Sequence, residues 1–287
     1  MRNKNLLAAL AILIAMGIAA LVAWAGSQSS VKVNGLPLFA LCGLVAFALQ
    51  WLVFIPSFAL QTEKLFDLTG CLTYLSLMLM AAMLGPPLKA ADVLLLSMCA
   101  LWALRLGSFL FLRIHQDGSD RRFNDIKPVF MRFLVAWTLQ GLWVYLTLCA
   151  VLVVVCSPAP HATTVYTAAG AAIWLLGFGL EVIADMQKRA FRANPANSGR
   201  FIQTGLWSWS RHPNYLGEMS LWLGVFVCVL PQLQGWQWVA LISPLFIVLL
   251  LTRVSGVPLL EAQADQRWGR DADYLAYKKA TPVLWPW

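Results

Sequence analysis

Long runs of apolar residues, separated by short polar segments, fill most of the sequence. A helix needs about 20 residues to cross the hydrocarbon core of a bilayer, and eight runs reach or approach that length. These runs are Leu6–Ala25, Leu36–Leu60, Leu68–Leu84, Val93–Leu112, Phe133–Cys156, Thr167–Met186, Asn214–Leu230 and Val239–Val254. The last two are short and the eighth contains Pro244, so the expected number lies between seven and nine. The pattern predicts an all-α, polytopic transmembrane helical bundle of about eight spans.

The composition agrees with a membrane protein and excludes other classes. Hydrophobic residues make up 60% of the chain and charged residues only 12%, whereas a soluble domain is about half apolar and a quarter charged. Disordered chains and small disulfide-stapled secreted modules are excluded on the same grounds. The first run resembles a signal peptide, but it is longer than the usual hydrophobic region of one, so we expect a retained membrane anchor.

The cysteines give no sign of a metal centre or a disulfide framework. They show no C-x-x-C pair and no histidine at ligand spacing. All six lie within apolar runs or at their ends: Cys42, Cys71, Cys99, Cys149, Cys156 and Cys228. We therefore expect them to be small packing residues, and no metal site.

Lysine and arginine residues are distributed unevenly between the two sides of the predicted bundle. Outside the spans, all of them except Lys32 and Lys89 fall on the side of the N-terminus, and Arg105 lies within a span. Because cytoplasmic loops are enriched in Lys and Arg, both termini are expected in the cytoplasm. This distribution explains the net charge of +8 without a nucleic-acid partner. Short loops and the lack of an N-glycosylation sequon favour the bacterial inner membrane over the endoplasmic reticulum.

Charged residues also occur at membrane depth, near the cytoplasmic end of the sixth run. Glu181 and Asp185 are four residues apart, and Lys188, Arg189 and Arg192 continue on or near the same helical stripe. One interpretation is a ladder of ion pairs that closes the helix end. The other is the wall of a polar cavity, whose acids accept hydrogen bonds from a ribose or an amide and whose bases meet phosphate.

The densest polar motif is GLWSWSRHPNYLGE, at residues 205–218. Pro213 suits the first turn of a helix, so the seventh span is expected to begin here with its positive dipole end towards the cytoplasm. Free backbone N–H groups, together with Arg211 and His212, predict an anion site. Further on, residues 273–279 form either an ordinary amphipathic tail or the cover of a pocket.

These motifs resemble the C-terminal signature of steroid 5-alpha-reductase-like membrane proteins, in the bacterial branch of largely uncharacterised function. The resemblance runs from Asp185 to Glu218, through Gly205-Leu206-Trp207 and Ser210–Glu218. It continues through Ser255–Glu261, Tyr274–Lys279, Glu63–Gly70 and Arg113–Lys127, so it covers most of the chain after residue 60. It implies a helical membrane bundle that binds NADPH from the cytoplasmic side.

The resemblance also implies which residues contact the cofactor. They are Asp185, Arg192, Asn194, Arg200, Trp207, Arg211, His212, Asn214 and Tyr215, to which we add Glu218 and Tyr274 from the same segments. We therefore expect a single membrane domain over residues 1–287. Within it, residues 1–180 would form mainly hydrophobic spans on the side of a lipid substrate, and residues 181–287 the cofactor-binding region.

The expected catalytic pair is less sharply defined. Characterised steroid reductases use a carboxylate and a tyrosine from the N-terminal spans to polarise an enone carbonyl. The nearest candidates here are Gln61, Glu63, Asp67 and Tyr74, of which we choose Glu63 and Tyr74. Glu63 and Asp67, four residues apart, also fit an ordinary interfacial turn paired with Lys64. The expected function is an NADPH-dependent reduction of a carbon–carbon double bond in a lipophilic substrate, steroid-like or isoprenoid.

Two alternatives remain open at this point. The Arg-His-Pro-x-Tyr core also occurs in isoprenylcysteine and phospholipid methyltransferases, so an S-adenosylmethionine-dependent lipid or isoprenylcysteine-type methyltransferase is the second hypothesis. The many basic groups around the motif argue against it, because that cofactor carries no phosphate. The third hypothesis is a non-catalytic lipid-binding membrane protein.

Overall fold

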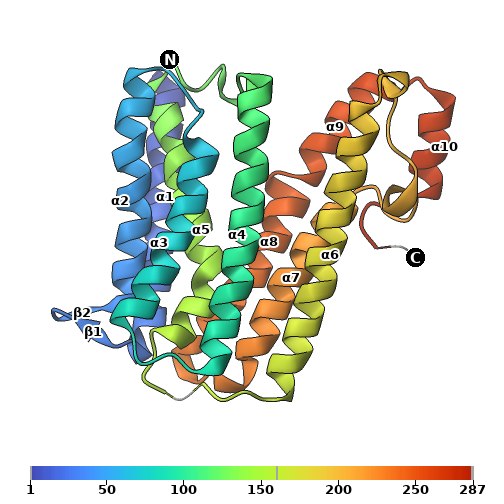
Figure 1. Cartoon of the computed structure of the whole chain (residues 1–287). Helices are drawn as coiled ribbons and strands as arrows, with labels where there is room; N and C mark the ends of the chain where they lie inside the picture. The colour runs from blue at the N-terminus through green and yellow to red at the C-terminus, as the bar shows by residue number, and fades with distance from the viewer. Residues whose placement is uncertain (1, 160, 286–287) are drawn as a thin grey trace. The chain divides into compact units, whose positions relative to one another are not determined.

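The computed structural model describes residues 2–159 and 161–285, and it confirms a helical membrane protein (Figure 1). Eight helical segments are long and apolar enough to cross a membrane, and they coincide with the eight predicted runs. The chain divides into two compact units, Met1–Thr164 with Val229–Ser243, and Val165–Cys228 with Pro244–Trp287. The boundary therefore lies at Val165, before the sixth span, and a short segment after the seventh span belongs with the first unit.

The first unit is built around one buried helix. Its helices are α1 (Arg2–Gly26), α2 (Leu38–Ala59), α3 (Phe66–Leu84), α4 (Ala90–Asp117) and α5 (Phe130–Val155). The helix α5 packs against the other four and against the 3₁₀ helix η6 (Gly235–Leu241). Its second half is almost completely buried, so a run of Leu, Val and Cys there forms the core of the unit.

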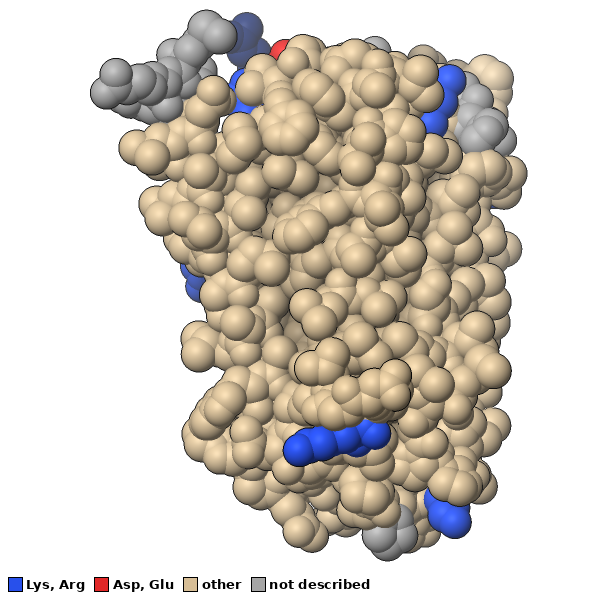
Figure 2. All heavy atoms as spheres, turned by 90° about the vertical axis from the view of Figure 1, so that its left-hand side faces the viewer, with Lys and Arg blue, Asp and Glu red and all other residues tan. Residues whose placement is uncertain are grey.

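The outer helices present apolar side chains outwards instead. Large hydrophobic residues of α1 and α2 such as Leu6, Leu13, Leu52 and Ile55 are exposed. Figure 2 shows that the middle of one face is almost free of charged side chains, with Lys and Arg placed towards its ends. Such a surface suits contact with lipid acyl chains.

A short β-hairpin follows α1 and precedes α2. Its strands are β1 (Lys32–Val33) and β2 (Leu36–Pro37), paired antiparallel with Val33 opposite Leu36. The turn residues Asn34 and Gly35 both have positive φ angles, 50° and 84°, which a tight hairpin turn of this type requires. The hairpin was not predicted, although Asn-Gly is a recognised signal for it.

In the second unit, glycines let α6 (Val165–Ala193) and α7 (Pro213–Val229) approach closely. A Cβ atom on Gly224 would lie 2.6 Å from the carbonyl oxygen of Gly170, and one on Gly217 would lie 2.6 Å from that of Gly177. On each helix the two contacting glycines are seven residues apart, so they form one seam along the pair. The seam holds the start of α7 beside the polar end of α6.

The helical backbone is interrupted between the last membrane-spanning run and the C-terminal helices. The helix α8 (Ile242–Leu249) continues as a π-helical segment over Leu250–Val254, and Gly256 then caps the start of the next helix. Gly256 has φ 47°, and a Cβ atom there would lie 2.7 Å from the carbonyl oxygen of Leu251, so only glycine fits. The helices α9 (Val257–Trp268) and α10 (Ala272–Ala280) follow and complete the unit.

Candidate functional site

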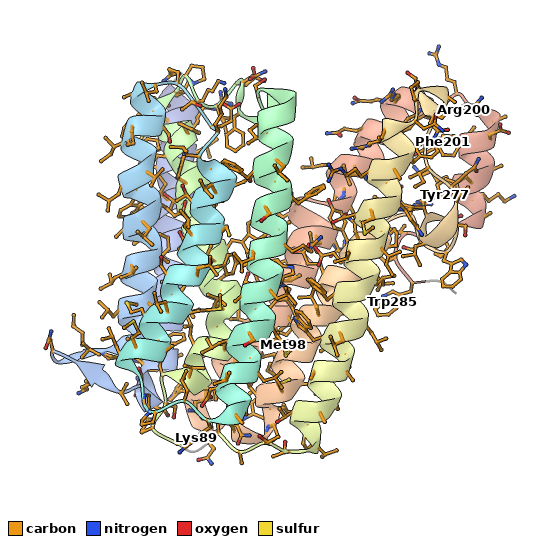
Figure 3. All side chains as sticks on the ribbon, viewed as in Figure 1. Lys89, Met98, Arg200, Phe201, Tyr277 and Trp285 are labelled. Atoms are coloured by element: carbon orange, nitrogen blue, oxygen red, sulfur yellow. The ribbon has the colours of Figure 1, made fainter. Side chains whose placement is uncertain are left out.

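Most of the predicted cofactor residues meet around one cavity of about 210 Å³ in the second unit. The end of α6, the loop that follows it, the residues before α7, and the helices α9 and α10 all contribute to its walls. The lining residues are Lys188, Phe191, Arg192, Arg200, Phe201, Ile202, Trp207, Arg211, His212, Leu260, Glu261, Gln263, Ala264, Arg267, Trp268, Tyr274 and Tyr277. Figure 3 labels three of them: Arg200 and Phe201 in the loop after α6, and Tyr277 on α10.

The carboxylate of Glu261, one turn into α9, organises the polar wall. It accepts hydrogen bonds from Arg211 Nη2 at 2.9 Å and Arg211 Nε at 3.2 Å. It also bonds His212 Nε2 at 2.8 Å, and Lys278 Nζ lies 3.6 Å away. The two adjacent residues of the Arg-His-Pro motif therefore both attach the start of α7 to α9.

The guanidinium of Arg211 is used within the protein. Besides the two bonds to Glu261, its Nη1 donates to the carbonyl oxygens of Lys278 at 2.6 Å and Thr281 at 3.1 Å. Its backbone N–H donates to the carbonyl oxygen of Pro282 at 3.0 Å. Arg211 thus joins the segment before α7 to α9 and to the end of α10, and it also lines the cavity.

His212 has one buried ring nitrogen that makes no hydrogen bond in the described part of the chain. The imidazole is buried, and its ring lies nearly parallel to that of Tyr215, with 5.7 Å between the centroids. Its Nε2 bonds Glu261, whereas its buried Nδ1 has no hydrogen-bond partner within the described part of the chain. If Nε2 carries the proton that Glu261 accepts, Nδ1 is an acceptor.

Aromatic rings form another wall of the cavity. Phe201 lies against Tyr274, Tyr277 and Trp268, with ring centroids 5.3, 5.5 and 5.8 Å away. Tyr277 donates to the carbonyl oxygen of Trp207 at 2.6 Å, and Tyr274 donates to Asp265 Oδ1 at 2.9 Å. Burial raises the pKa of Tyr277 to about 12, and burial with the Asp265 carboxylate raises that of Tyr274. Both phenols therefore remain protonated donors at neutral pH.

The described wall of the cavity contains more basic than acidic side chains. Lys188 lies over the ring of Trp207, with its Nζ 4.6 Å from the centroid. Arg192, Arg200 and Arg267 are exposed residues of the cavity wall. Among the described residues of the wall the single acid is Glu261, which pairs with Arg211. The cavity is thus an electropositive, aromatic-walled site that suits an anionic ligand with a flat ring.

Five predicted cofactor residues lie outside this wall. Tyr215 supports His212, and Asn194 accepts a hydrogen bond from the Ala196 N–H at 3.0 Å as the cap of a short 3₁₀ turn. Asp185, Asn214 and Glu218 belong to α6 and α7 but are not among the lining residues. In the described part of the chain, the cavity is thus bordered by Arg211 and His212, the two residues before α7, and by no residue of α7 itself.

The two catalytic candidates are in different surroundings. Glu63 accepts from Lys127 Nζ at 2.7 Å and from the Asp120 N–H at 2.8 Å, so its partner is Lys127 and not Lys64. Burial alone would raise the pKa of Glu63, but these hydrogen bonds outweigh burial and hold it below its ordinary value. A carboxyl group kept ionised in this way is a poor proton donor.

Tyr74 lies in a separate cavity of about 40 Å³ in the first unit. Its ring packs edge-to-face on Trp102, with centroids 5.3 Å apart. Asp67 and Gln140 line the same cavity, and Glu63 does not. Within the described chain, the carboxylate that shares a cavity with Tyr74 is therefore that of Asp67. Asp67 lies on the same helix, α3, about two turns before Tyr74.

Several wall residues were not predicted from the sequence. On α9 they are Leu260, Glu261, Gln263, Ala264, Arg267 and Trp268. Their spacing of three and four residues is that of one helix face, so helical periodicity in residues 257–268 was a usable signal. Phe201 and Tyr277 carried no such signal, because their roles depend on contacts between distant segments.

Comparison with known proteins gives a family but no described activity. No curated protein and no solved structure matches the chain. One family model matches residues 53–281, which is most of the chain and includes both cavities. This family is related to steroid 5-alpha-reductase-like proteins, in agreement with the resemblance of the motifs. The chain belongs to the family described as "Protein of unknown function (DUF1295)".

Proposed function

We propose that this protein is an integral membrane reductase that binds NADPH in the basic, aromatic-walled cavity of the second unit. The observation that carries the proposal is the excess of positive charge in that wall. Lys188, Arg192, Arg200 and Arg267 all line the cavity, whereas the acid among its described wall residues is Glu261, which pairs with Arg211. Phosphate groups are the ligands that such a cluster binds best.

The other wall residues fit the same cofactor. Phe201, Trp268 and Tyr277 offer flat apolar faces to a base, and His212 Nδ1 offers a buried acceptor. The cavity of about 210 Å³ is smaller than the roughly 300–1,000 Å³ of whole ligand pockets. We therefore assign it to the phosphate-bearing adenosine part of the dinucleotide.

The substrate side is proposed for the first unit. NADPH, when bound, supplies a hydride to one carbon of a carbon–carbon double bond. The cavity around Tyr74 has mainly apolar walls and lies between membrane-spanning helices, so it suits a lipophilic steroid-like or isoprenoid substrate. Tyr74 is the candidate acid, and Asp67 takes the place that the sequence had suggested for Glu63.

Ligand binding to the purified full-length protein tests the cofactor. We expect NADPH to bind more tightly than NADH, because only NADPH has the additional phosphate. Arg200→Ala and Arg267→Ala should each weaken NADPH binding about three- to tenfold, as expected for a partly exposed charged contact. Arg270→Ala is the matched control, since Arg270 is exposed and does not line the cavity.

The alternatives give different results in the same titration. S-adenosylmethionine carries no phosphate, so a methyltransferase would bind it with an affinity that the arginine variants leave largely unchanged. Binding of that molecule without binding of NADPH would refute the reductase proposal. A lack of binding of all three molecules would favour the non-catalytic lipid-binding protein.

A further inference from the structure

A second polar cluster, in the first unit, plays no part in the proposed reduction. His161 Nδ1 lies 2.7 Å from Asp92 Oδ1, and both side chains are almost completely buried, with 1% and 9% exposed. Asp92 Oδ2 accepts the backbone N–H of Lys89 at 2.8 Å, just before α4 begins. Both carboxylate oxygens thus have donors, and Asp92 fixes the orientation of the imidazole.

The other imidazole nitrogen of His161, Nε2, has a different environment from Nδ1. In the neutral tautomer whose Nδ1–H donates to Asp92, Nε2 of His161 carries a lone pair. This atom is buried and has no hydrogen-bond partner among residues 2–159 and 161–285. A buried polar atom without a partner is unfavourable, so it marks a position where a ligand can bind.

His161 lines a cavity of about 240 Å³. The apolar part of the wall comes from Pro86, Pro87, Val154, Val155 and Pro158, and the polar part from Lys89, Asp92, Ser157 and His161. One water occupies about 30 Å³ of the liquid, so the cavity has room for a small organic group. Ser157 Oγ accepts from the Ala159 N–H at 3.3 Å and from Gln237 Nε2 at 3.4 Å. Because no bond joins Ser157 to His161, the cluster is not a nucleophilic triad.

The position of the cavity narrows the class of ligand. It lies where the span of α4 begins at Ala90 and the span of α5 ends at Val155, which is the depth of lipid head groups. Lys89 is exposed at this end of the unit, immediately before α4 (Figure 3). Lys89 and the positive end of α4 favour a negative group, while His161 Nε2 requires a hydrogen-bond donor.

We propose that this cavity binds a hydroxylated phosphate ester, as found in the head group of phosphatidylglycerol. A hydroxyl of the ligand donates to His161 Nε2, and the phosphate lies near the Lys89 ammonium. The apolar wall contacts the carbon skeleton of the glycerol. Nothing in the site depends on a nucleotide, so the proposal stands apart from the proposed reductase activity.

Binding by the full-length protein in detergent, without nucleotide, tests this site. The probes are dioleoyl-phosphatidylglycerol, dioleoyl-phosphatidylcholine, which lacks a hydroxyl donor, and soluble glycerol 3-phosphate, each titrated by native mass spectrometry. We expect phosphatidylglycerol to bind at least about threefold more tightly than phosphatidylcholine, since one hydrogen bond is worth about 0.5–1.5 kcal/mol. Glycerol 3-phosphate of equal affinity would support the same chemistry with a soluble source.

Three variants separate ligand contact from folding. His161→Asn keeps a side-chain N–H for Asp92 but removes the Nε2 acceptor, so it should fold and should weaken phosphatidylglycerol binding about three- to tenfold. Lys89→Ala should reduce the preference for the anionic lipid, and Lys32→Ala, an exposed lysine of β1, is the control. Unchanged binding by a folded His161→Asn variant would overturn the proposal, as would equal affinity for the two lipids.

Discussion

Arg211 and Arg200 line the same cavity, but their replacement should affect different properties. Loss of Arg211 should lower the stability of the protein, and loss of Arg200 should weaken NADPH binding. Replacing Arg211 by alanine removes two hydrogen bonds to Glu261 and two to the carbonyl oxygens of Lys278 and Thr281. A hydrogen bond to a charged group is worth about 1.5–3 kcal/mol. Glu261 keeps His212 and Lys278 as neighbours, and the side chains of Arg211 and Glu261 are 11% and 19% exposed, so water screens part of the loss. We therefore expect a net loss of about 3 kcal/mol in the free energy of unfolding.

This loss can be measured as a change in melting temperature. At roughly 2–4 °C per kcal/mol for a chain of this size, Arg211→Ala should lower Tm by about 6–12 °C. The 14 tryptophans of the chain make their intrinsic fluorescence a suitable readout in detergent. Arg211→Lys keeps the charge but not the planar fork, and should give an intermediate value. Arg200→Ala, at an exposed position, should change Tm by no more than about 1–2 °C while it weakens NADPH binding. A Tm for Arg211→Ala equal to that of the wild type would refute the structural role of Arg211.

Two further predictions concern the glycine seam and the buried carboxylate of Glu63. Gly224→Ala should destabilise the protein by about 1–3 kcal/mol, because the added Cβ would lie 2.6 Å from the Gly170 carbonyl oxygen and from the Trp174 nitrogen; Gly179→Ala is the control, since a Cβ there meets no atom within 4 Å, and equal melting temperatures for the two variants would exclude the close packing. Because the pKa of Glu63 in the folded protein lies below its ordinary value of 4.5, its contribution to stability is complete above that value and is lost as the pH falls through the folded pKa. Between pH 6 and pH 3, the melting temperature of the wild type should thus decrease more than that of Glu63→Gln. An equal decrease in the two proteins would contradict this reasoning.

The spans were predictable from the sequence because the length of an apolar run is a local property. The ends of the helices were less accurate. The run Thr167–Met186 becomes the helix α6, which continues to Ala193, because helical hydrogen bonding continues after the chain leaves the membrane and becomes polar. The π-helical segment before Gly256 could not be predicted, since its geometry depends on the close contact of Gly256 with Leu251 and not on a local propensity.

The candidate site was predictable in part for the same reason. The motif at residues 205–218 and the basic stripe of α6 are local features, and the structure brings Lys188, Arg192, Trp207 and His212 to one cavity. The pairing of Arg211 with Glu261 joins residues 50 positions apart, and no pattern within either segment specifies it. As a result, the sequence predicted the segments that line the cavity but not the ion pair that Arg211 makes within the protein.

The bonds of Glu261 explain why the Arg-His-Pro-x-Tyr core is a weak guide to the chemistry of a protein. In this chain Arg211 and His212 both bond Glu261, and Tyr215 supports the His212 ring. The core therefore connects the start of α7 to α9 and positions the polar wall of the cavity. This structural role does not depend on the identity of the ligand. Under the proposed function, selection of the cofactor would fall to residues outside the core, namely the basic side chains of α6, α9 and the loop between α6 and α7. A reductase and a methyltransferase with the same core should accordingly differ in the charge of these segments, and the four basic residues here favour a phosphate-bearing cofactor.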